Sequence, residues 1–341
     1  MSPARKSRVA VVGVGHFGRN HARVYATMPD VELVAVADPD ADRCRTIGEQ
    51  YGARAVASHT QVGEVDAVSI AVPTKHHAEV ACWFLERGIP VLVEKPLADS
   101  VAAARRIVDT ASRHGTFVGV GHVERFNPVV VAATEMGIRP IFIECHRLNP
   151  FSFRSTDVGV VLDLMIHDLD VILHFVGSKV DRVDAVGIGI LSTHEDIANA
   201  RIGFENGAVA NVTASRVAVQ PMRKIRVFSP DSYISLDYGK RQGVIYRKSP
   251  KLTLDMVQRI TADPSSLTDL KGKESVFGEL LQSETIPLPE HDPLEKELSN
   301  FIRSVRDKGR PAVTGEHGLE VLRIADAILE EIRKAQAAAL P

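Results

Sequence analysis

The stretch Arg8-Val-Ala-Val-Val-Gly13-Val-Gly15-His-Phe-Gly18 decides the fold of this chain. An apolar run typical of a buried strand leads into glycines with G-x-G-x-x-G spacing, and residues 16–28 then have a helical pattern. Strand, glycine loop and helix in this order are the context that a dinucleotide-binding fingerprint requires. Gly13 permits the tight turn, Gly15 lets the backbone approach a pyrophosphate, and Gly18 lets the helix pack on the sheet. A glycine-rich turn without a ligand is the alternative, and the agreement of strand, spacing and helix argues against it.

Outward from this stretch, strands and helices alternate. Strands are predicted at 8–14, 31–37, 66–72, 91–93 and 117–121, with helices at 16–28, 41–51, 75–87 and 100–114. Alternation of this length predicts an α/β fold, a doubly wound parallel sheet with helices on both faces. We therefore expect an NAD-binding Rossmann domain at residues 1–122.

The pattern changes after about residue 122. Helices are predicted at 127–137, 163–175, 294–306 and 318–335, and strands at 141–146, 199–204, 208–215, 225–229, 233–237 and 244–247. Several strands with few helices between them predict an α+β domain at 123–341, with an open, largely antiparallel sheet for substrate binding and oligomerisation. Its last helix is expected to pack back toward the Rossmann domain. Residues 249–292 have weak periodicity, so a long excursion or loop is expected there.

Composition excludes several functional classes. The chain has 341 residues, 45% of them apolar and 25% charged, which is ordinary for a globular protein. Its 41 basic and 43 acidic residues give a net charge of −2, which argues against binding nucleic acid or an acidic membrane. The apolar runs are too short for a membrane span, and no signal-peptide core follows the basic N-terminus. With three widely spaced cysteines, Cys44, Cys82 and Cys145, we expect a cytoplasmic protein with reduced thiols.

Asp38 is the predicted selector of the cofactor. It lies 20 residues beyond Gly18, at the end of the second predicted strand. A carboxylate there accepts hydrogen bonds from the adenosine ribose hydroxyls and repels a 2′-phosphate, which favours NAD over NADP. The alternative is that Asp38 only caps the helix predicted at 41–51, and the two roles are compatible.

Lys95 is the first candidate for catalysis. The sequence Glu94-Lys95-Pro96 ends the apolar run 91–93, about 80 residues past the glycine loop. In a doubly wound sheet the carboxyl ends of the strands face the cofactor crevice, so a lysine here points at the reacting end of a dinucleotide. Pro96 fixes the turn, for which a cis bond is one route. The alternative is an exposed turn lysine.

Asp163 and His167 form the second candidate pair. They are four residues apart and share one face of a predicted helix. A carboxylate beside an imidazole raises the histidine pKa and orients the ring, which makes His167 a candidate general base for a hydroxyl proton. An ion pair on a helix surface and a zinc site are the alternatives. Because no further His or Cys has motif-like spacing, no metal is predicted.

Three motifs of this chain, in this order, resemble those of the glucose–fructose oxidoreductase/inositol dehydrogenase (Gfo/Idh/MocA) family. They are the glycine fingerprint Gly13-x-Gly-x-x-Gly18, the sequence Glu94-Lys95-Pro96 and the pair Asp163-x-x-x-His167. The loop at residues 72–79 and the segment Pro311-Ala-Val-Thr-Gly315 are also similar, so the resemblance extends over essentially the whole chain. The resemblance implies hydride transfer between NAD(P) and a sugar, cyclitol or similar carbinol. It also implies subunit pairing through the open sheet, and hence a homodimer or homotetramer.

Residue roles follow from the same resemblance. Lys95 would orient and polarise the reacting hydroxyl, and His167, supported by Asp163, would exchange its proton. Three residues, Pro73, His77 and Glu94, would lie by the nicotinamide half of the cofactor. We also assign His16 and Phe17, inside the glycine loop, and His122 to the cofactor site.

The segment His122-Val-Glu-Arg125-Phe-Asn-Pro128 departs from the commoner family pattern. Together with residues 157–160 and 167–170, this segment is similar to that of the UDP-N-acetylglucosamine 3-dehydrogenase branch of the family. Enzymes of that branch oxidise the sugar 3-hydroxyl to a ketone, which an aminotransferase then uses. A UDP-sugar needs cationic groups for its diphosphate. The candidates are Arg125, Arg147, Arg154 and Arg216, each with solvated surface arginine as the alternative.

Two rival functions stay open. One is oxidation of another carbinol, in a free sugar, an inositol or a different nucleotide sugar. The other is a non-catalytic regulator that binds a dinucleotide to sense it and docks a partner. The presence of Lys95, Asp163 and His167 together favours turnover over sensing.

Overall fold

The computed structural model describes residues 5–152, 158–249 and 281–339, which form two units. The first unit is made by the described residues of Met1–Asn127, Leu169–Val171 and His291–Glu330. The second unit is made by those of Pro128–Asp168, Ile172–Glu290 and Glu331–Pro341. This division differs from the predicted boundary at residue 122 chiefly because residues 291–330 fold with the N-terminal segment.

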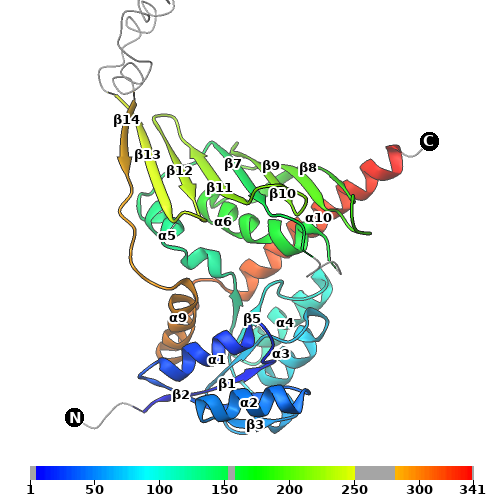
Figure 1. Ribbon diagram of the computed structural model, residues 1–341, viewed down its shortest axis with the longest axis vertical. Coiled ribbons are helices and arrows are strands. Elements are labelled where there is room, and N and C mark those ends of the chain that lie inside the picture. The colour runs from blue at the N-terminus through cyan, green and yellow to red at the C-terminus, as the bar shows by residue number, and fades with distance from the viewer. Residues whose placement is uncertain (1–4, 153–157, 250–280, 340–341) are drawn as a thin grey trace, which may run out of the picture. The chain divides into compact units, whose positions relative to one another are not determined.

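The sheet of the first unit is parallel throughout, and Figure 1 labels its strands β1, β2, β3 and β5. Its strands are β1 (Ser7–Val12), β2 (Val31–Ala37), β3 (Arg54–Val56), β4 (Ala67–Ile70), β5 (Val91–Glu94) and β6 (Val118–Gly121), in the order β3-β2-β1-β4-β5-β6. This arrangement confirms the predicted doubly wound sheet. The order reverses at β1 and β4, and the crevice at such a switch point is where this fold binds its ligands. Strand β3 was not predicted, because it is only three residues long and largely exposed.

The helices of this unit follow the predicted ranges closely. They are α1 (Gly18–Thr27), α2 (Ala41–Tyr51), α3 (His77–Leu85), α4 (Val101–Arg113), α9 (Pro293–Asp307) and the first part of α10 (Gly315–Ala339), with 3₁₀ turns at His59–Gln61, Thr74–His76 and Val123–Phe126. None of the helices in the described ranges is long and apolar enough to cross a membrane. All three cysteines are buried free thiols, as predicted.

Helix α9 belongs to the first unit because its apolar face completes that unit's core. Leu298, Phe301 and Ile302 are buried in one cluster with side chains of β1, β2 and α1. Burial of each such side chain contributes about 2 kcal/mol. At the end of the helix, Arg306 forms an ion pair with the Asp30 carboxylate and donates a 2.9 Å hydrogen bond to its backbone carbonyl. These contacts connect residues almost 280 positions apart in the chain.

The second unit is built on an eight-stranded sheet. Its strands are β7 (Phe142–Leu148), β8 (Val180–Ile188), β9 (Ile197–Phe204), β10 (Val209–Ser215), β11 (Met222–Phe228), β12 (Ser232–Asp237), β13 (Gln242–Lys248) and β14 (Leu281–Thr285), in the order β14-β13-β12-β11-β7-β10-β9-β8. Strands β7 and β10 are parallel and all other neighbours are antiparallel, which confirms the largely antiparallel sheet. The predictions missed β8 and β14, which carry mostly exposed residues.

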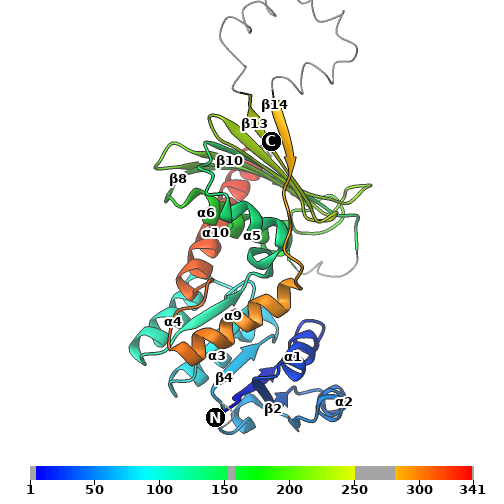
Figure 2. The same cartoon turned by 90° about the vertical axis from the view of Figure 1, so that its left-hand side faces the viewer.

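Two helices cover the same face of this sheet, α5 (Pro128–Glu135) and α6 (Ile166–Val176), as Figure 2 shows. Residues of β7 alternate between buried and half-buried positions, as expected of a sheet covered on one face. Helix α6 does not begin as predicted. Residues Val161–Met165 form a π-helical turn ahead of it, in which the Ile166 N–H bonds to the Val161 carbonyl five residues earlier.

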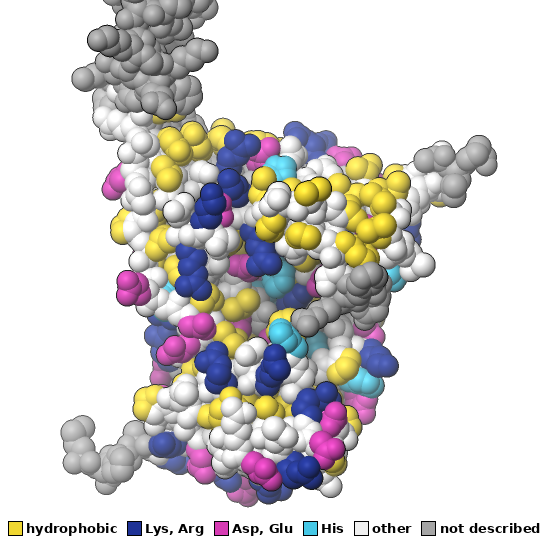
Figure 3. Space-filling model, in the orientation of Figure 1, with side chains coloured by type: hydrophobic (Ala, Val, Ile, Leu, Met, Phe, Trp, Pro, Cys, Tyr) yellow, Lys and Arg dark blue, Asp and Glu magenta, His cyan; other side chains and the backbone are white. Residues whose placement is uncertain are grey.

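The other face of the sheet carries a row of aromatic rings. Phe142, Phe228, Tyr233 and Tyr246 stack in sequence across four strands, with neighbouring ring centroids 5.6, 5.2 and 4.4 Å apart. All four are half-buried. Hydrophobic side chains also gather over the β8 and β9 end of the sheet in Figure 3, where Val186 and Ile188 are more than half exposed.

Candidate active site

The glycine loop after β1 has the geometry that its spacing predicts. Gly13 has φ +83°, and a Cβ there would lie 2.6 Å from the Ala71 carbonyl oxygen. A Cβ on Gly18 would lie 1.8 Å from the carbonyl oxygen of Gly13. Around Gly15, by contrast, a Cβ would have no described atom within 4 Å. Two glycines are therefore required by packing, and the third borders open space.

That space is part of a cavity of about 470 Å³ in the first unit. Its lining consists of Gly13, Gly15, Phe17, Asp38, Pro39, Arg43, Ala71, Val72, Pro73, Thr74, His77, Glu94 and Lys95. Helix α1 begins beside it, with Phe17 at its N-cap. The Arg19 and Asn20 N–H groups donate to the Gly15 and Phe17 carbonyls, so within the first turn the Gly18 N–H is the one without an acceptor among the described residues. Size, glycine lining and helix terminus fit a dinucleotide. The structure thus brings together eight predicted site residues, whereas His16, Gly18 and His122 do not line the cavity.

Asp38 lies at the cavity and is buried. One carboxylate oxygen accepts a 2.9 Å hydrogen bond from the Val14 N–H, and the other accepts from the Asp40 N–H and from Arg43. Burial alone would raise the pKa of Asp38, but the Arg43 hydrogen bond and two backbone N–H groups hold it below its usual value. The N-cap of α2 is Asp40, not Asp38, so capping does not explain the Asp38 side chain.

Lys95 lies directly after β5 and precedes a cis peptide bond to Pro96, the route that the sequence suggested. His77 connects this turn to the loop after β4. Its Nδ1 lies 3.0 Å from the Pro96 carbonyl oxygen and its Nε2 lies 2.9 Å from that of Val72. Burial lowers the His77 pKa, although the two carbonyl groups oppose this effect. The ring contacts both loops that line the cavity and thereby positions them.

Glu94 is held from two sides. Its Oε1 lies 2.8 Å from His21 Nε2, and its Oε2 accepts a 3.2 Å hydrogen bond from the Lys95 N–H. His21 is buried in α1, one turn beyond the glycine loop. This contact links the phosphate-facing helix to the strand that carries Lys95. Sequence reasoning missed His21, because a single histidine in a helix gives no sign of its partner.

His122, at the end of β6, is fully buried. Neither of its ring nitrogens has a hydrogen-bond partner among the described residues. Burial lowers its pKa to about 3, and the positive charges of Arg125 and Lys95 contribute to the shift. His122 is therefore neutral at any working pH and cannot act as a cation toward a cofactor.

Arg125 and Asp170 form a buried ion pair in the first unit, with 3.1 Å between Nε and Oδ2. Burial raises the pKa of Asp170 to about 7, and Arg125 opposes that rise. Nearby, Glu297 of α9 is fully buried, and neither of its carboxylate oxygens has a partner among the described residues. Burial, with added repulsion from Glu94 and Asp170, raises the Glu297 pKa well above its usual value. Neither Asp170 nor Glu297 was assigned a site role from the sequence, although Asp170 closes the run 167–170 that carries the resemblance.

The second unit carries the other predicted catalytic residues. Asp163 lies inside the π-helical turn and His167 lies in the first turn of α6, both half-buried. The His167 Nδ1 atom is shielded from solvent. The two residues thus come from a π turn and an α-helix, not from the single regular helix that was predicted.

Two of the arginines predicted to bind the substrate diphosphate, Arg147 and Arg216, instead form hydrogen bonds with buried carboxylates of this chain. Arg147 donates two 2.8 Å hydrogen bonds to Asp168, and Arg216 donates a 2.8 Å hydrogen bond to Asp196. Both guanidinium groups are at least 94% buried. Their carboxylate partners occupy the donors that a diphosphate would use, so this arrangement favours a structural role. Arg154 lies outside the described residues.

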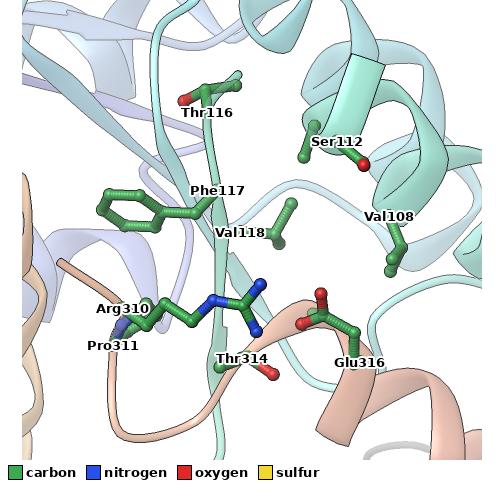
Figure 4. Close-up of a pocket in the computed structure, with 11 residues that line it drawn as sticks. Val108, Ser112, Thr116, Phe117, Val118, Arg310, Pro311, Thr314 and Glu316 are labelled. Carbon is green, nitrogen blue, oxygen red and sulfur yellow. The ribbon is translucent and has the colours of Figure 1, made fainter. Parts of the chain in front are cut away.

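A second cavity, of about 100 Å³, lies at the start of α10. In Figure 4 the side chains of Arg310 and Glu316 point toward one another across it. None of the predicted catalytic or cofactor residues lines this cavity. Within the described ranges, no group of three or more His, Cys, Asp and Glu side chains is arranged to hold a metal ion.

Family models match both parts of the chain. A model described as "Oxidoreductase family, NAD-binding Rossmann fold" matches residues 7–122. A model of the GFO/IDH/MocA C-terminal domain matches residues 139–232.

Individual relatives have related activities. UDP-N-acetylglucosamine 3-dehydrogenase of Acidithiobacillus ferrooxidans is 32% identical over 320 residues, which cover 93% of this chain and 95% of that protein. A solved structure of that enzyme matches with a TM-score of 0.83 and 31% identity, over 96% of this chain and 98% of its own. Inositol 2-dehydrogenase of Rubrobacter xylanophilus is 35% identical over 191 residues, 53% of this chain and 55% of that protein.

Proposed function

The chain belongs to the Gfo/Idh/MocA family of NAD(P)-dependent oxidoreductases, and on that premise we propose that it is a cytoplasmic enzyme that oxidises the 3-hydroxyl of UDP-N-acetylglucosamine to a ketone. The observation that carries this proposal is the cavity that Lys95 and the glycine loop line together. A lysine at that position lies at the reacting end of a dinucleotide bound to the loop. The substrate follows from the similarity to the Acidithiobacillus enzyme over almost the whole chain.

NAD is the proposed cofactor. The glycine loop, with the Gly18 N–H at the start of α1, would hold its pyrophosphate, and Asp38 would accept hydrogen bonds from its adenosine ribose. Arg43 also lines the cavity, and an arginine beside the ribose is the group that accommodates NADP in this fold. In this chain, however, Arg43 is paired with both Asp38 and Asp40. Two carboxylates against one guanidinium leave a local negative charge, which supports NAD over NADP.

Three residues are proposed to carry the chemistry. When NAD is bound, its nicotinamide ring accepts the hydride from the carbinol carbon. Lys95 would donate a hydrogen bond to the reacting hydroxyl and stabilise the alkoxide that develops on it. His167 would take the hydroxyl proton as general base, and the carboxylate of Asp163 would stabilise the imidazolium that forms. His77, Glu94 and His21 would keep Lys95 in place by the contacts described above.

The aromatic face of the second unit supports a homo-oligomer. The aromatic row and the exposed Val186 and Ile188 lie on one sheet face, which also carries the Arg226–Glu144 ion pair. Aromatic, aliphatic and arginine side chains together form a surface of the kind that protein interfaces cover. A second copy of the chain is the proposed occupant, giving a dimer or a tetramer of two dimers.

The 3-ketone product is proposed to pass to an aminotransferase, since a ketone is the substrate that such an enzyme requires.

The test is formation of reduced nicotinamide from NAD with UDP-N-acetylglucosamine. Free N-acetylglucosamine, inositols and other UDP-sugars are run in parallel. Because oxidation of an alcohol by NAD can be unfavourable, an aminotransferase with glutamate is added to remove the ketone. Turnover with UDP-N-acetylglucosamine at a kcat/KM at least about 100-fold above the other compounds is the expected result; this ratio corresponds to about 2.7 kcal/mol of discrimination.

Other outcomes would revise the proposal. Turnover with an inositol or a free sugar alone would keep the catalytic residues and overturn the substrate. Absence of turnover across the panel, with NAD binding intact, would favour a dinucleotide-sensing regulator. Assignment of the product's carbonyl carbon by NMR separates oxidation at the 3-position from oxidation at another hydroxyl, which gives a product of the same mass.

A further inference from the structure

The π-helical turn at Val161–Met165 contains Asp163 and ends one residue before α6, in which His167 is the second residue. A π turn holds more residues than an α turn, so it changes the angle between a residue inside it and a residue just after it. The relation between Asp163 and His167 therefore depends on this turn being kept. Such turns are rare and occur frequently at functional sites, and what stabilises this one is a question of function.

Glu195 binds the entrance to the turn. Its backbone carbonyl accepts a 3.0 Å hydrogen bond from the Val160 N–H, and its carboxylate Oε1 accepts a 3.1 Å hydrogen bond from the Val161 N–H. These N–H groups belong to the first turn of the helix, where no helical carbonyl can accept from them. Glu195 is 8% exposed and precedes β9, so one residue from a distant segment satisfies two donors at the start of the turn.

Arg216 and Asp196 hold Glu195 and the turn together. The Arg216 guanidinium donates a 2.8 Å hydrogen bond to the Val158 carbonyl and another of 2.8 Å to Asp196. Asp196 is fully buried and also accepts three backbone N–H groups, those of residues 190–192. These contacts fix the segment that carries Glu195 against the residues before the π turn.

The backbone at Gly159 packs closely against the Glu195 carboxylate. A Cβ on Gly159 would lie 1.8 Å from Glu195 Oε1 and 2.1 Å from its Cδ. The backbone before the turn therefore lies directly against the Glu195 carboxylate, at a distance that only glycine allows. A methyl group at this position would displace the carboxylate from Val161 without changing Glu195 itself.

We infer that Glu195 is a positioning residue, which fixes the π turn and thereby the placement of Asp163 relative to His167. This inference rests on the proposed function, in which His167 is the general base and Asp163 its carboxylate partner. Glu195 touches neither residue through a described contact and acts through the backbone of Val160 and Val161. Glu195 does not line the cavity proposed for the cofactor.

Three variants test the inference. Glu195→Ala removes the acceptor, and Gly159→Ala displaces it. Glu195→Gln keeps an amide oxygen that can accept from Val161. In single-turnover hydride transfer, we expect Glu195→Ala and Gly159→Ala to slow the rate about 10- to 100-fold, the effect of misplacing a catalytic group. Glu195→Gln should stay within about threefold of wild type, and NAD affinity should be unchanged in all three.

The pH dependence supplies the readout that loss of stability alone would not move. A neighbouring carboxylate raises the pKa of an imidazole, so withdrawing Asp163 lowers the pKa of His167. The acidic limb of the rate profile should shift to lower pH in Glu195→Ala and Gly159→Ala. NMR titration of the His167 ring measures the same shift without any turnover. Asn206→Ala, in the β9–β10 turn, is a control variant. It should lower the melting temperature but leave the pH of the acidic limb of the rate profile unchanged.

The results distinguish failure of the positioning role of Glu195 from failure of the proposed catalytic role of His167. A wild-type rate and an unshifted limb in Glu195→Ala and Gly159→Ala would overturn the inference. So would Glu195→Gln behaving like Glu195→Ala, because the charge rather than the hydrogen bond would then matter. A His167→Ala variant that retains the wild-type rate would instead overturn the catalytic assignment in the proposed function.

Discussion

Arg43 donates a 2.8 Å hydrogen bond to Asp38 at the wall of the cofactor cavity. The Arg43 side chain is 45% exposed whereas that of Asp38 is 5% exposed, so the acid is buried and the base remains partly accessible. Two residues with opposite preferences for a 2′-phosphate thus lie in contact. Under the proposed NAD preference, this contact would keep Arg43 from binding a 2′-phosphate.

Asp38→Ala should therefore change the cofactor preference. Loss of the carboxylate removes the repulsion of a 2′-phosphate and frees Arg43 to bind it. We expect the ratio of kcat/KM for NADP to that for NAD to rise at least about 10-fold, equivalent to about 1.4 kcal/mol. The double variant Asp38→Ala/Arg43→Ala should lose most of this gain. An unchanged ratio in the single variant would show that Asp38 only organises the loop through Val14 and Asp40.

Lys95→Met and His167→Ala should slow turnover and leave NAD binding intact. Loss of the group that stabilises the alkoxide should cost about 10²–10³ in kcat, and loss of the general base about 10²–10⁴. The dissociation constant for NAD, measured by nicotinamide fluorescence or calorimetry, should stay within about threefold of wild type. A fall in NAD affinity parallel to the fall in rate would contradict both roles.

Gly15→Ala and Gly18→Ala form a matched pair in one loop. A Cβ at residue 15 meets no described atom, so this variant should fold normally, but the methyl group enters the space proposed for the pyrophosphate. We expect NAD affinity to fall about 10- to 100-fold at an unchanged melting temperature. A Cβ at residue 18 meets the Gly13 carbonyl oxygen, so this variant should lose about 3 kcal/mol of stability or more. Normal NAD binding by Gly15→Ala would exclude the proposed pyrophosphate site.

Glu297→Gln should alter the pH dependence of stability. The folded-state pKa of Glu297 is raised, so its contribution to stability is fully present below the unfolded value near 4.3 and is lost as pH rises through the folded value. Glutamine is always neutral and lacks this loss. The unfolding free energy of the variant, relative to wild type, should increase from pH 5 to pH 8.

Urea unfolding at each pH measures this difference, whose slope approaches about 1.4 kcal/mol per pH unit where Glu297 is protonated only in the folded state. The charged groups that face Glu297, namely Glu94, Asp170 and its partner Arg125, are the same in both proteins and largely cancel in the comparison. Parallel stability curves for wild type and variant would show that Glu297 does not hold a proton in this range.

The sequence predicted the first sheet well because each strand and helix there is a local pattern. The glycine spacing, the strand before Lys95 and the turn at Pro96 all depend on neighbouring residues, and the structure has them as predicted. The short, exposed β3 and the charged edge strand β8 have no apolar period to mark them.

Other features depend on contacts that a linear pattern does not contain. A period of 3.6 residues predicts a helix around Asp163 but does not distinguish a π turn from an α turn. Arg147 and Arg216 were recognised as cations, yet their carboxylate partners lie 21 and 20 residues away in the chain. The apolar stripe of α9 predicts that this face of the helix is buried. The structure identifies what it packs against, namely α1 and the strands β1 and β2.

The composition of the first unit has a consequence for biosynthesis. A ribosome synthesises Met1–Asn127 first, but the Leu298 and Phe301 side chains that fill the core of this unit emerge only after more than 160 further residues. Until then Val24, Tyr25 and their neighbours face solvent or a chaperone. The unit that carries the glycine loop therefore completes its core only after α9 has been synthesised.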